Sequence, residues 1–345
     1  MKTSKDKFSA IALLLTFVGV FFLGVVIVAG ILFFNEKTLL VPDEFPTISA
    51  AVTAADPGDI ILVKTKEDGT PYEENVTIIT EDIKLIGIGK EKPVLDGDTV
   101  VGGGGITLTN TSGVLVKNFI IRNFDDEGIF LDSSDRIMIK GNNINDNGDE
   151  GIQLSSSSSI MIKGNTFNGN GAEGVFLSSS DGNMIKGNTS NGNDSDGVLL
   201  SGGSGGNMIK GNTINDNFDG IFLSSSDGNM VKGNTINRND DGIDLANSNN
   251  NMIKGNNVKG NGGEGISLRL SSNKNVIKRN TANNNDDNGI FLSVDSNDND
   301  VFVNRAFGNG DGVLSFDIND LNITPPLNTF KGNKCGTSFP AVICN

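Results

Sequence analysis

Hydrophobic and polar residues alternate along most of this chain in short segments that recur with a fixed period. Methionine marks the period most clearly, because the six methionines after the initiator are spaced by 22 to 24 residues. The phrase MIKGN recurs around them, for example at 184–188 and 208–212. A period of this length predicts a solenoid, in which each repeat forms one coil stacked on the next.

Each repeat predicts three short strands separated by turns. Representative strands are 137–140 (IMIK), 213–215 (TIN) and 221–223 (IFL), with Gly, Asn, Asp and Ser between them. No segment of a repeat keeps a 3.6-residue periodicity, which excludes a helical repeat. A Gly-Ile or Gly-Val step marks successive coils, at Gly128, Gly151, Gly174, Gly197, Gly220, Gly242, Gly265, Gly289 and Gly312.

Both ends of the repeat region carry further motifs. Residues 45–48 (FPTI) and 57–63 (PGDIILV) flank an alanine-rich stretch, and residues 328–344 form a distinctive tail. Together with the coils, these motifs resemble the right-handed parallel β-helix repeat family, which includes pectin-lyase-like and NosD-like proteins. The resemblance covers about residues 38–345. It implies an all-β, single-stranded, right-handed parallel β-helix whose first coil is closed by a short helix at 47–55.

We therefore expect about ten coils and three parts in the β-helix. Residues 38–112 should form the N-terminal cap and first coils, 113–327 the regular repeats of 22–25 residues, and 328–345 a C-terminal cap. Two columns of asparagine should stack along the turns and bond to one another through their amides. We assign these columns a structural role and no ligand.

The N-terminus predicts a membrane anchor. Residues 8–34 form an apolar run without charge, preceded by Lys2, Lys5 and Lys7. Such a run is long enough to span a bilayer, and the lysines favour a cytoplasmic location for residues 1–7. Removal as a signal peptide is the alternative, since Ala29-Gly30 could permit cleavage. We expect an uncleaved anchor that places the rest of the chain outside the cell.

The amino-acid composition limits the classes of molecule that this chain can bind. The formal net charge is −15, and such an acidic chain repels nucleic acid. The two cysteines, Cys335 and Cys344, lie close together at the C-terminus. A disulfide between them fits an extracellular location, while two free thiols are the alternative.

Strand alternation places a methionine column and a lysine column on the outer surface. The methionine column is continued by Leu115 and Val276, and its thioethers could hold copper(I). The NosD-like resemblance implies copper-related roles for some relatives. The alternatives are mutual apolar burial or docking of a partner. The lysines either keep the protein soluble or form a rail for an anionic polymer.

A third column consists of carboxylates that directly precede the glycine step. Repulsion between such side chains should raise their pKa values or recruit cations, and calcium prefers oxygen ligands. Ordinary turn chemistry without a metal is the alternative. The candidate calcium ligands are Glu127, Glu150, Glu173, Asp196, Asp219, Asp241 and Glu264.

Three residues after each carboxylate lies an outward position of the third strand. In four coils this position holds phenylalanine, namely Phe130, Phe176, Phe222 and Phe291. Phenylalanines beside polar groups could stack on sugar rings, so we take these four as candidate carbohydrate-binding residues. A self-association face is the alternative.

One segment raises the question of catalysis. Residues 239–244 (NDDGID) resemble the first conserved motif of polygalacturonases, which implies acid/base roles for Asp241 with Glu264, and Asp244 beside them. The other motifs of that family are missing, and the chain has no histidine. The central coils also vary little in length, which leaves no insertion to form a cleft.

We therefore favour a non-enzymatic scaffold on the cell surface that binds envelope polysaccharide or a surface protein. A lyase, hydrolase or epimerase acting on acidic polysaccharide is the second hypothesis. Copper handling is the third. No cofactor follows from the sequence except the possible calcium.

Overall fold

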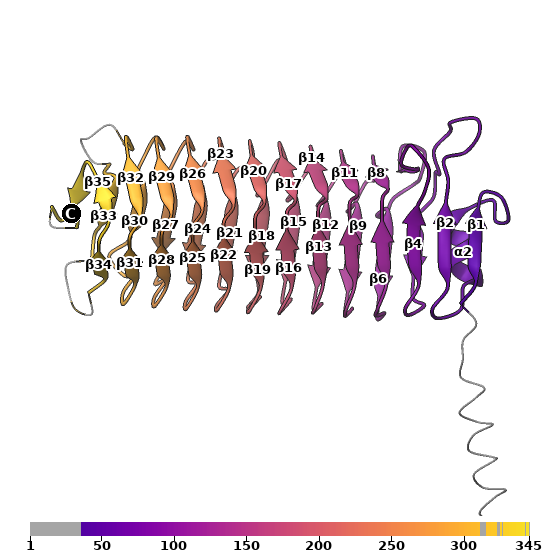
Figure 1. Cartoon of the computed structure of the whole chain (residues 1–345), viewed down its shortest axis with the longest axis horizontal. Helices are drawn as coiled ribbons and strands as arrows, with labels where there is room; N and C mark the ends of the chain where they lie inside the picture. The colour runs from indigo at the N-terminus through magenta and orange to yellow at the C-terminus, as the bar shows by residue number, and fades with distance from the viewer. Residues whose placement is uncertain (1–35, 311–314, 323–324, 326, 342, 345) are drawn as a thin grey trace, which may run out of the picture.

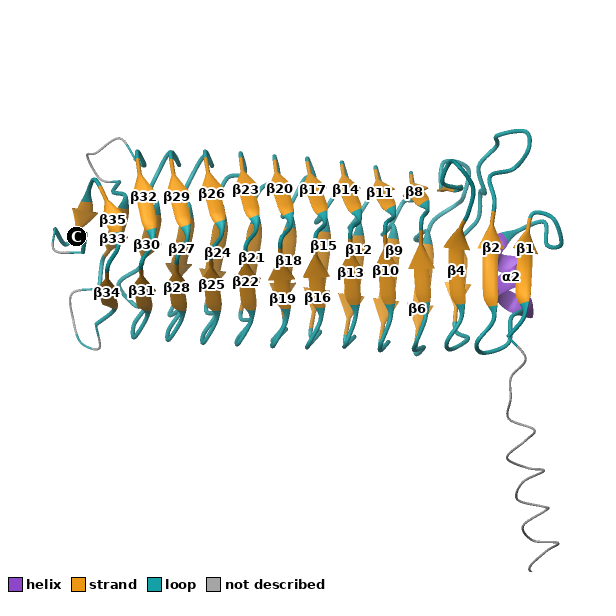
Figure 2. Ribbon diagram, in the orientation of Figure 1, coloured by secondary structure: helices purple, strands orange, loops and turns teal. Residues whose placement is uncertain are grey.

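The computed structural model describes residues 36–310, 315–322, 325, 327–341 and 343–344. The chain winds into a long solenoid whose strands form three parallel sheets running along the axis (Figures 1 and 2). The expected anchor at 8–34 and the N-terminal residues 1–7 lie outside the described residues. Among the residues that are described, no helix is long and apolar enough to cross a membrane.

Sheet A has thirteen strands and begins at the N-terminal end. Its strands are β1 (Thr38–Val41), β2 (Ile60–Val63), β4 (Lys84–Gly87), β7 (Leu115–Lys117), β10 (Met138–Lys140), β13 (Met161–Lys163), β16 (Met184–Lys186), β19 (Met208–Lys210), β22 (Met230–Lys232), β25 (Met252–Lys254), β28 (Val276–Lys278), β31 (Asp300–Phe302) and β34 (Thr329–Lys331).

Sheet B has eleven strands and follows sheet A within each turn. Its strands are β5 (Val94–Asp96), β8 (Ile120–Arg122), β11 (Asn143–Asn145), β14 (Thr166–Asn168), β17 (Thr189–Asn191), β20 (Thr213–Asn215), β23 (Thr235–Asn237), β26 (Asn257–Lys259), β29 (Thr281–Asn283), β32 (Arg305–Phe307) and β35 (Lys334–Cys335).

Sheet C has twelve strands and completes each turn. Its strands are β3 (Val76–Ile78), β6 (Ile106–Thr109), β9 (Ile129–Asp132), β12 (Ile152–Ser155), β15 (Val175–Ser178), β18 (Val198–Ser201), β21 (Ile221–Ser224), β24 (Ile243–Ala246), β27 (Ile266–Arg269), β30 (Ile290–Leu292), β33 (Ile318–Asp320) and β36 (Ser338–Phe339).

The parallel β-solenoid is confirmed, but the expected number of about ten coils is wrong. The described residues form about thirteen turns, as the strands of sheet A show. The turns at the two ends escaped the count because they depart from the regular repeat: β1 and β2 are joined through a helix, and residues 328–344 supply β34, β35 and β36.

The core is a set of apolar columns inside the solenoid. Alternation places one residue of each short strand inward, and in sheet A these residues include Val116, Ile139 and Ile162, which are fully buried. The neighbouring strands pair in register, so that Ile139 lies between Val116 and Ile162. Each turn therefore buries its apolar face against the turns before and after it.

Buried asparagines link the turns, as expected. Asn212 shows the pattern: its Oδ1 accepts the Asn188 backbone N–H at 2.8 Å and the Asn188 Nδ2 at 3.1 Å. Its own Nδ2 donates to the Ile185 carbonyl and to Asn234 Oδ1. A further asparagine column, which the sequence analysis did not identify, runs through Asn183, Asn207, Asn229, Asn251, Asn275 and Asn299.

The N-terminal end is closed by the expected helix. Helix α2 (Ile48–Ala54) is capped by Thr47, whose hydroxyl accepts the Ala50 N–H at 3.1 Å. Ile48, Ala51 and Val52 are buried, and the helix packs beside β1 and β2 (Figure 1). This apolar face covers the first turn.

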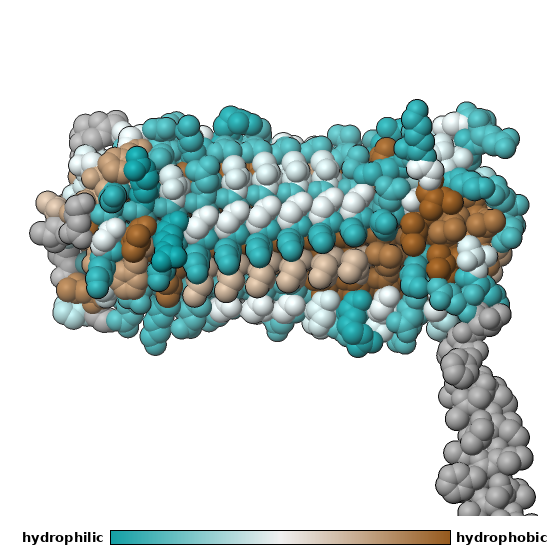
Figure 3. Space-filling view, viewed as in Figure 1, coloured by the Kyte–Doolittle hydropathy of each residue, from teal (hydrophilic) through white to brown (hydrophobic). Residues whose placement is uncertain are grey.

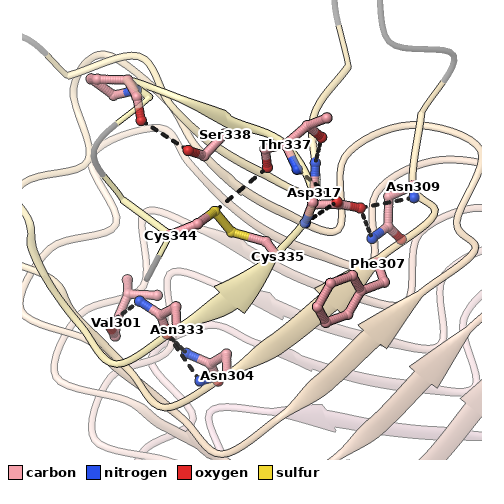
Figure 4. The surroundings of a disulfide bond; sticks show 12 residues. Val301, Asn304, Phe307, Asn309, Asp317, Asn333, Cys335, Thr337, Ser338 and Cys344 are labelled. Atoms are coloured by element: carbon pink, nitrogen blue, oxygen red, sulfur yellow. Dashed lines mark hydrogen bonds between the residues drawn. A yellow bond between two sulfur atoms is a disulfide. The ribbon is translucent and has the colours of Figure 1, made fainter.

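The C-terminal turn is held by the expected disulfide and by one aspartate. Cys335 and Cys344 are bonded, with their Cα atoms 5.6 Å apart (Figure 4). Asp317 accepts hydrogen bonds from Asn309 through one carboxylate oxygen and from the Gly336 and Thr337 N–H groups through the other. Asp317 thus ends one of the asparagine columns and ties the last turn to it.

Candidate functional site

The three outer faces differ in chemistry. Sheet A carries the methionine and lysine columns in perfect register from β10 to β25. Figure 3 shows the methionines as a continuous, moderately hydrophobic row beside hydrophilic rows. Sheet B presents mainly threonine and asparagine. Sheet C carries the candidate carboxylates and phenylalanines, so the candidate recognition residues gather on one face.

A steric constraint positions the carboxylates at the start of sheet C. Each precedes a glycine over which the next turn packs closely. A Cβ at Gly242 would lie 2.2 Å from Val258 Cγ1 and 2.4 Å from the Gly265 carbonyl oxygen. Only glycine fits there, and the residue before it is therefore held at the same place in every turn.

The predicted carboxylate column forms and bonds along the axis. Asp196 accepts the Asp219 N–H at 3.0 Å, Asp219 accepts the Asp241 N–H at 3.1 Å, and Asp241 accepts the Glu264 N–H at 2.7 Å. These bonds give the aspartates a structural function, since each carboxylate satisfies a backbone donor of the next turn.

Burial changes the acidity of the column. Glu150, Asp196 and Asp219 are buried. Loss of solvent, reinforced by neighbouring carboxylates, raises the pKa of Glu150 and of Asp196 to about 7 and the pKa of Asp219 to about 6. Glu150 and Asp196 are therefore partly protonated near neutral pH, whereas Asp219 is mostly ionised there.

The predicted phenylalanine positions share one column of sheet C. Phe130, Phe176, Phe222 and Phe291 are half-buried rather than fully exposed. Other residues occupy the turns between them: Gln153 lies between Phe130 and Phe176, and Leu199 lies between Phe176 and Phe222. Phenylalanines on alternate turns lie about 9.6 Å apart, twice the strand spacing.

The column is broken after Phe222 by Asp244, which is completely buried. Its Oδ2 accepts two hydrogen bonds from the Arg269 guanidinium, from Nε at 2.8 Å and from Nη2. The Oδ1 has no hydrogen-bond partner among the described residues. Arg269 also lies over the Phe222 ring, 5.7 Å from its centroid. Burial raises the pKa of Asp244, and the arginine opposes this shift.

Asp241 and Glu264 lie beside this buried pair, on successive turns. Burial, and after it the charge of Glu264, raises the pKa of Asp241.

We refer to Phe222, Asp241, Asp244, Glu264 and Arg269 as the Asp244 cluster. Within it Asp241 and Glu264 are partly exposed, whereas Asp244 lies beneath the surface, although strand alternation had placed it outward. A protonated carboxyl beside a second carboxyl has the components for general acid/base chemistry.

Arg269 is the residue of the cluster that the sequence analysis missed. Its position is occupied by serine in four of the preceding strands and by Ala246 in the turn before it. The small side chain of Ala246 leaves room for the arginine to reach Asp244. The sequence contained one signal for this contact: Arg269 departs from the repeat one turn after Asp244 replaces an apolar residue.

The metal hypotheses gain no direct support. Among the described residues, no group of three or more histidine, cysteine, aspartate or glutamate side chains is arranged to hold a metal ion. The calcium ligands proposed from the sequence therefore remain a prediction. The same holds for copper at the methionine column.

Comparison with solved structures shows the same fold in polysaccharide-acting β-helix proteins. The A-module of the mannuronan C-5 epimerase AlgE4 of Azotobacter vinelandii superposes with a TM-score of 0.62 at 13% identity, over 85% of this chain and 99% of that one. The AlgE6 A-module of the same organism gives 0.61 at 15% identity, over 84% and 94%. An alginate lyase of a Paenibacillus species gives 0.51 at 14% identity, over 88% and 96%. At such identities the likeness concerns the fold alone.

No match was found among curated proteins. In contrast, the sequence model described as the right handed beta helix region matches two overlapping segments, residues 86–214 and 185–336. These segments cover most of the chain and most turns of the three sheets. The protein therefore belongs to the right-handed β-helix family.

Proposed function

We propose that this protein binds an extended polysaccharide along sheet C. The observation that carries the proposal is the line of half-buried phenylalanine and leucine side chains beside the carboxylate column. Apolar ring faces next to hydrogen-bonding groups suit sugars, which have apolar faces and hydroxyl edges. The fold neighbours are consistent with this class of ligand, since they are named for mannuronan and alginate.

The carboxylates supply the polar part of the proposed site. The partly exposed carboxyls of Glu127, Glu173, Asp241 and Glu264 would form hydrogen bonds with sugar hydroxyl groups, whereas the buried members of the column lie beneath the surface. An anionic polymer would require a bridging cation, for which calcium is our candidate. We further propose that residues 8–34 anchor the protein in a membrane with the β-helix on the cell surface.

A glycan array, read with and without calcium, tests this proposal. The full-length chain in detergent should bind at least one class of polysaccharide, and Phe176→Ala with Phe222→Ala should abolish retention. The matched control is Met184→Ala with Met208→Ala on sheet A, which should leave retention unchanged. Loss of binding in the sheet A control but not in the sheet C variant would reject the proposed face.

The second candidate function is acid/base catalysis on the same polymer. It is favoured by the raised pKa of Asp241, whose partly exposed carboxyl lies beside Glu264 on a surface where the repeat is broken. If this is so, incubation with a bound polymer should release new ends or change sugar configuration, and Asp241→Asn should stop the reaction while binding persists. Activity that survives Asp241→Asn with Glu264→Gln would exclude this site.

A further inference from the structure

The lysine column of sheet A has no carboxylate partners. Its members are Lys117, Lys140, Lys163, Lys186, Lys210, Lys232, Lys254 and Lys278, and none of them takes part in an ion pair among the described residues. The strands stack in register, which places like charges about 4.8 Å apart at their bases. In a protein of net charge −15 this face is therefore a segregated cationic strip that attracts external anions.

An apolar column runs beside the lysines for the same length. Leu115 continues the methionines at one end and Val276 at the other, and the outward positions of β7 to β28 contain no acidic residue. Toward the N-terminus the lysine column becomes apolar, because Ile86, Leu62 and Leu40 continue it, whereas the methionine column continues through Lys84, Ile60 and Thr38. Figure 3 shows this end as a hydrophobic patch continuous with the methionine row.

The hydrophobic patch lies where the chain enters the solenoid. Strand β1 begins at Thr38, and the uncharged apolar run of residues 8–34 ends only four residues before it. Adjacent apolar and lysine rows on one face are the features by which proteins lie in the interface of an anionic bilayer. A soluble anionic polymer would explain the lysines but not the apolar column. A second copy of sheet A would bring lysines against lysines without compensating carboxylates.

We propose that sheet A is a membrane-docking face that lies on anionic phospholipid. The lysines contact lipid phosphates, and the methionines and the N-terminal hydrophobic patch enter the interfacial region. The solenoid axis then runs parallel to the bilayer, and sheets B and C remain in water. This inference rests on sheet A and on the proposed membrane anchor at residues 8–34, and it goes beyond the polysaccharide site of sheet C.

Environment-sensitive fluorescence of the full-length protein tests the docking. A fluorophore is attached to Met184→Cys on sheet A or to Thr189→Cys on sheet B of the same turn, while the native cysteines remain bonded to each other. Each protein is reconstituted into phosphatidylcholine vesicles with or without phosphatidylglycerol, and nitroxide lipids serve as quenchers. We expect a blue shift and lipid quenching only at Met184→Cys, only with phosphatidylglycerol, and weaker at high salt.

Removal of lysine charges distinguishes docking of sheet A on the lipid from its mere proximity to the anchor. The variant Lys163→Gln, Lys186→Gln and Lys210→Gln should lose the response at Met184→Cys, although the protein remains in the vesicle. Equal signals at Met184→Cys and Thr189→Cys would overturn the proposal. So would a blue shift at Met184→Cys that soluble polyuronate produces without vesicles, because sheet A would then be a polymer site.

Discussion

At the scale of single residues, asparagine and aspartate hold successive turns together in different ways. The asparagine amide both accepts and donates hydrogen bonds, so that the Asn212 side chain bonds to three residues of the neighbouring turns, Asn188, Ile185 and Asn234. The aspartates of the carboxylate column accept one backbone bond each but bring a negative charge into a partly buried column. Asparagine therefore stabilises at every pH, whereas the aspartates make stability depend on pH.

Replacement of a buried asparagine should be costly. Asn212→Ala removes the acceptor of the Asn188 backbone N–H and a donor to the Ile185 carbonyl, whereas Asn234 Oδ1 keeps the Asn212 backbone N–H; each buried group left unpaired costs about 1–3 kcal/mol. We expect a loss of roughly 3 kcal/mol or more in the free energy of unfolding, measured by chemical denaturation. The control is Asn215→Ala on the outside of sheet B, which should cost less than about 1 kcal/mol. Equal losses would show that the asparagine column is not a main source of stability.

The raised pKa of Asp196 predicts a stability that falls as pH rises. In the unfolded chain this carboxyl titrates near 3.8, whereas in the fold its pKa is about 7. The folded state thus binds more protons between these values, and the stabilisation present at low pH is lost as pH rises through about 7. Asp196→Asn keeps an oxygen that accepts the Asp219 N–H but carries no charge.

Calorimetry can measure this effect. The melting temperature of Asp196→Asn should exceed that of the parent by a few degrees at pH 8 and by clearly less at pH 5, where the carboxyl is protonated in the fold but still ionised in the unfolded chain. Asp181→Asn is the control, because the exposed Asp181 also accepts a backbone N–H, from Gly205 at 2.7 Å. A gain that is the same at both pH values, or the same in the control, would contradict the assigned role of burial.

At the scale of elements, the turn between sheets B and C determines where the candidate site lies. The glycine step admits no side chain, which fixes the residue before it and directs the next outward position to the face of sheet C. This step was visible in the sequence because it repeats. The alternation of each strand likewise predicted the methionine, lysine and phenylalanine columns correctly.

The glycine step can be tested by adding one carbon atom. Gly242→Ala would force a Cβ against Val258 and the Gly265 carbonyl, and we expect a loss of about 2–3 kcal/mol in the free energy of unfolding. Gly262→Ala in the neighbouring turn is the matched control, since its Cβ would meet nothing closer than 3.7 Å. If both variants unfold at the same denaturant concentration as the parent, the steric account of the turn is wrong.

Other elements could not be predicted from the sequence, for physical reasons. The first strands have longer and less regular connections, so their turns were not counted. Asp244 was expected outside because alternation reports the direction of a side chain but not whether its neighbours cover it. Arg269, on the neighbouring strand β27, covers it in the folded protein. Burial of this kind depends on contacts across turns, which the periodicity of one strand does not contain.

At the scale of the whole molecule, the solenoid is a three-sided rod with a different chemistry on each side. Sheet A is cationic and apolar, sheet B is mainly polar with uncharged central strands, and sheet C is acidic with half-buried phenylalanines. The repeat explains this segregation, because one residue type per position becomes a column of that type. The two proposals assign different ligands to two faces of this rod: a sugar polymer to sheet C and a lipid surface to sheet A.

The most direct test of the central claim is to locate bound polysaccharide on the rod. Hydroxyl-radical footprinting with mass spectrometry compares the oxidation of the full-length protein in detergent with and without the polymer that it retains best. We predict protection of Phe176, Leu199 and Phe222 on sheet C, and unchanged oxidation of Met184 and Met208 on sheet A. Protection of the methionines with unchanged sheet C residues would contradict the account.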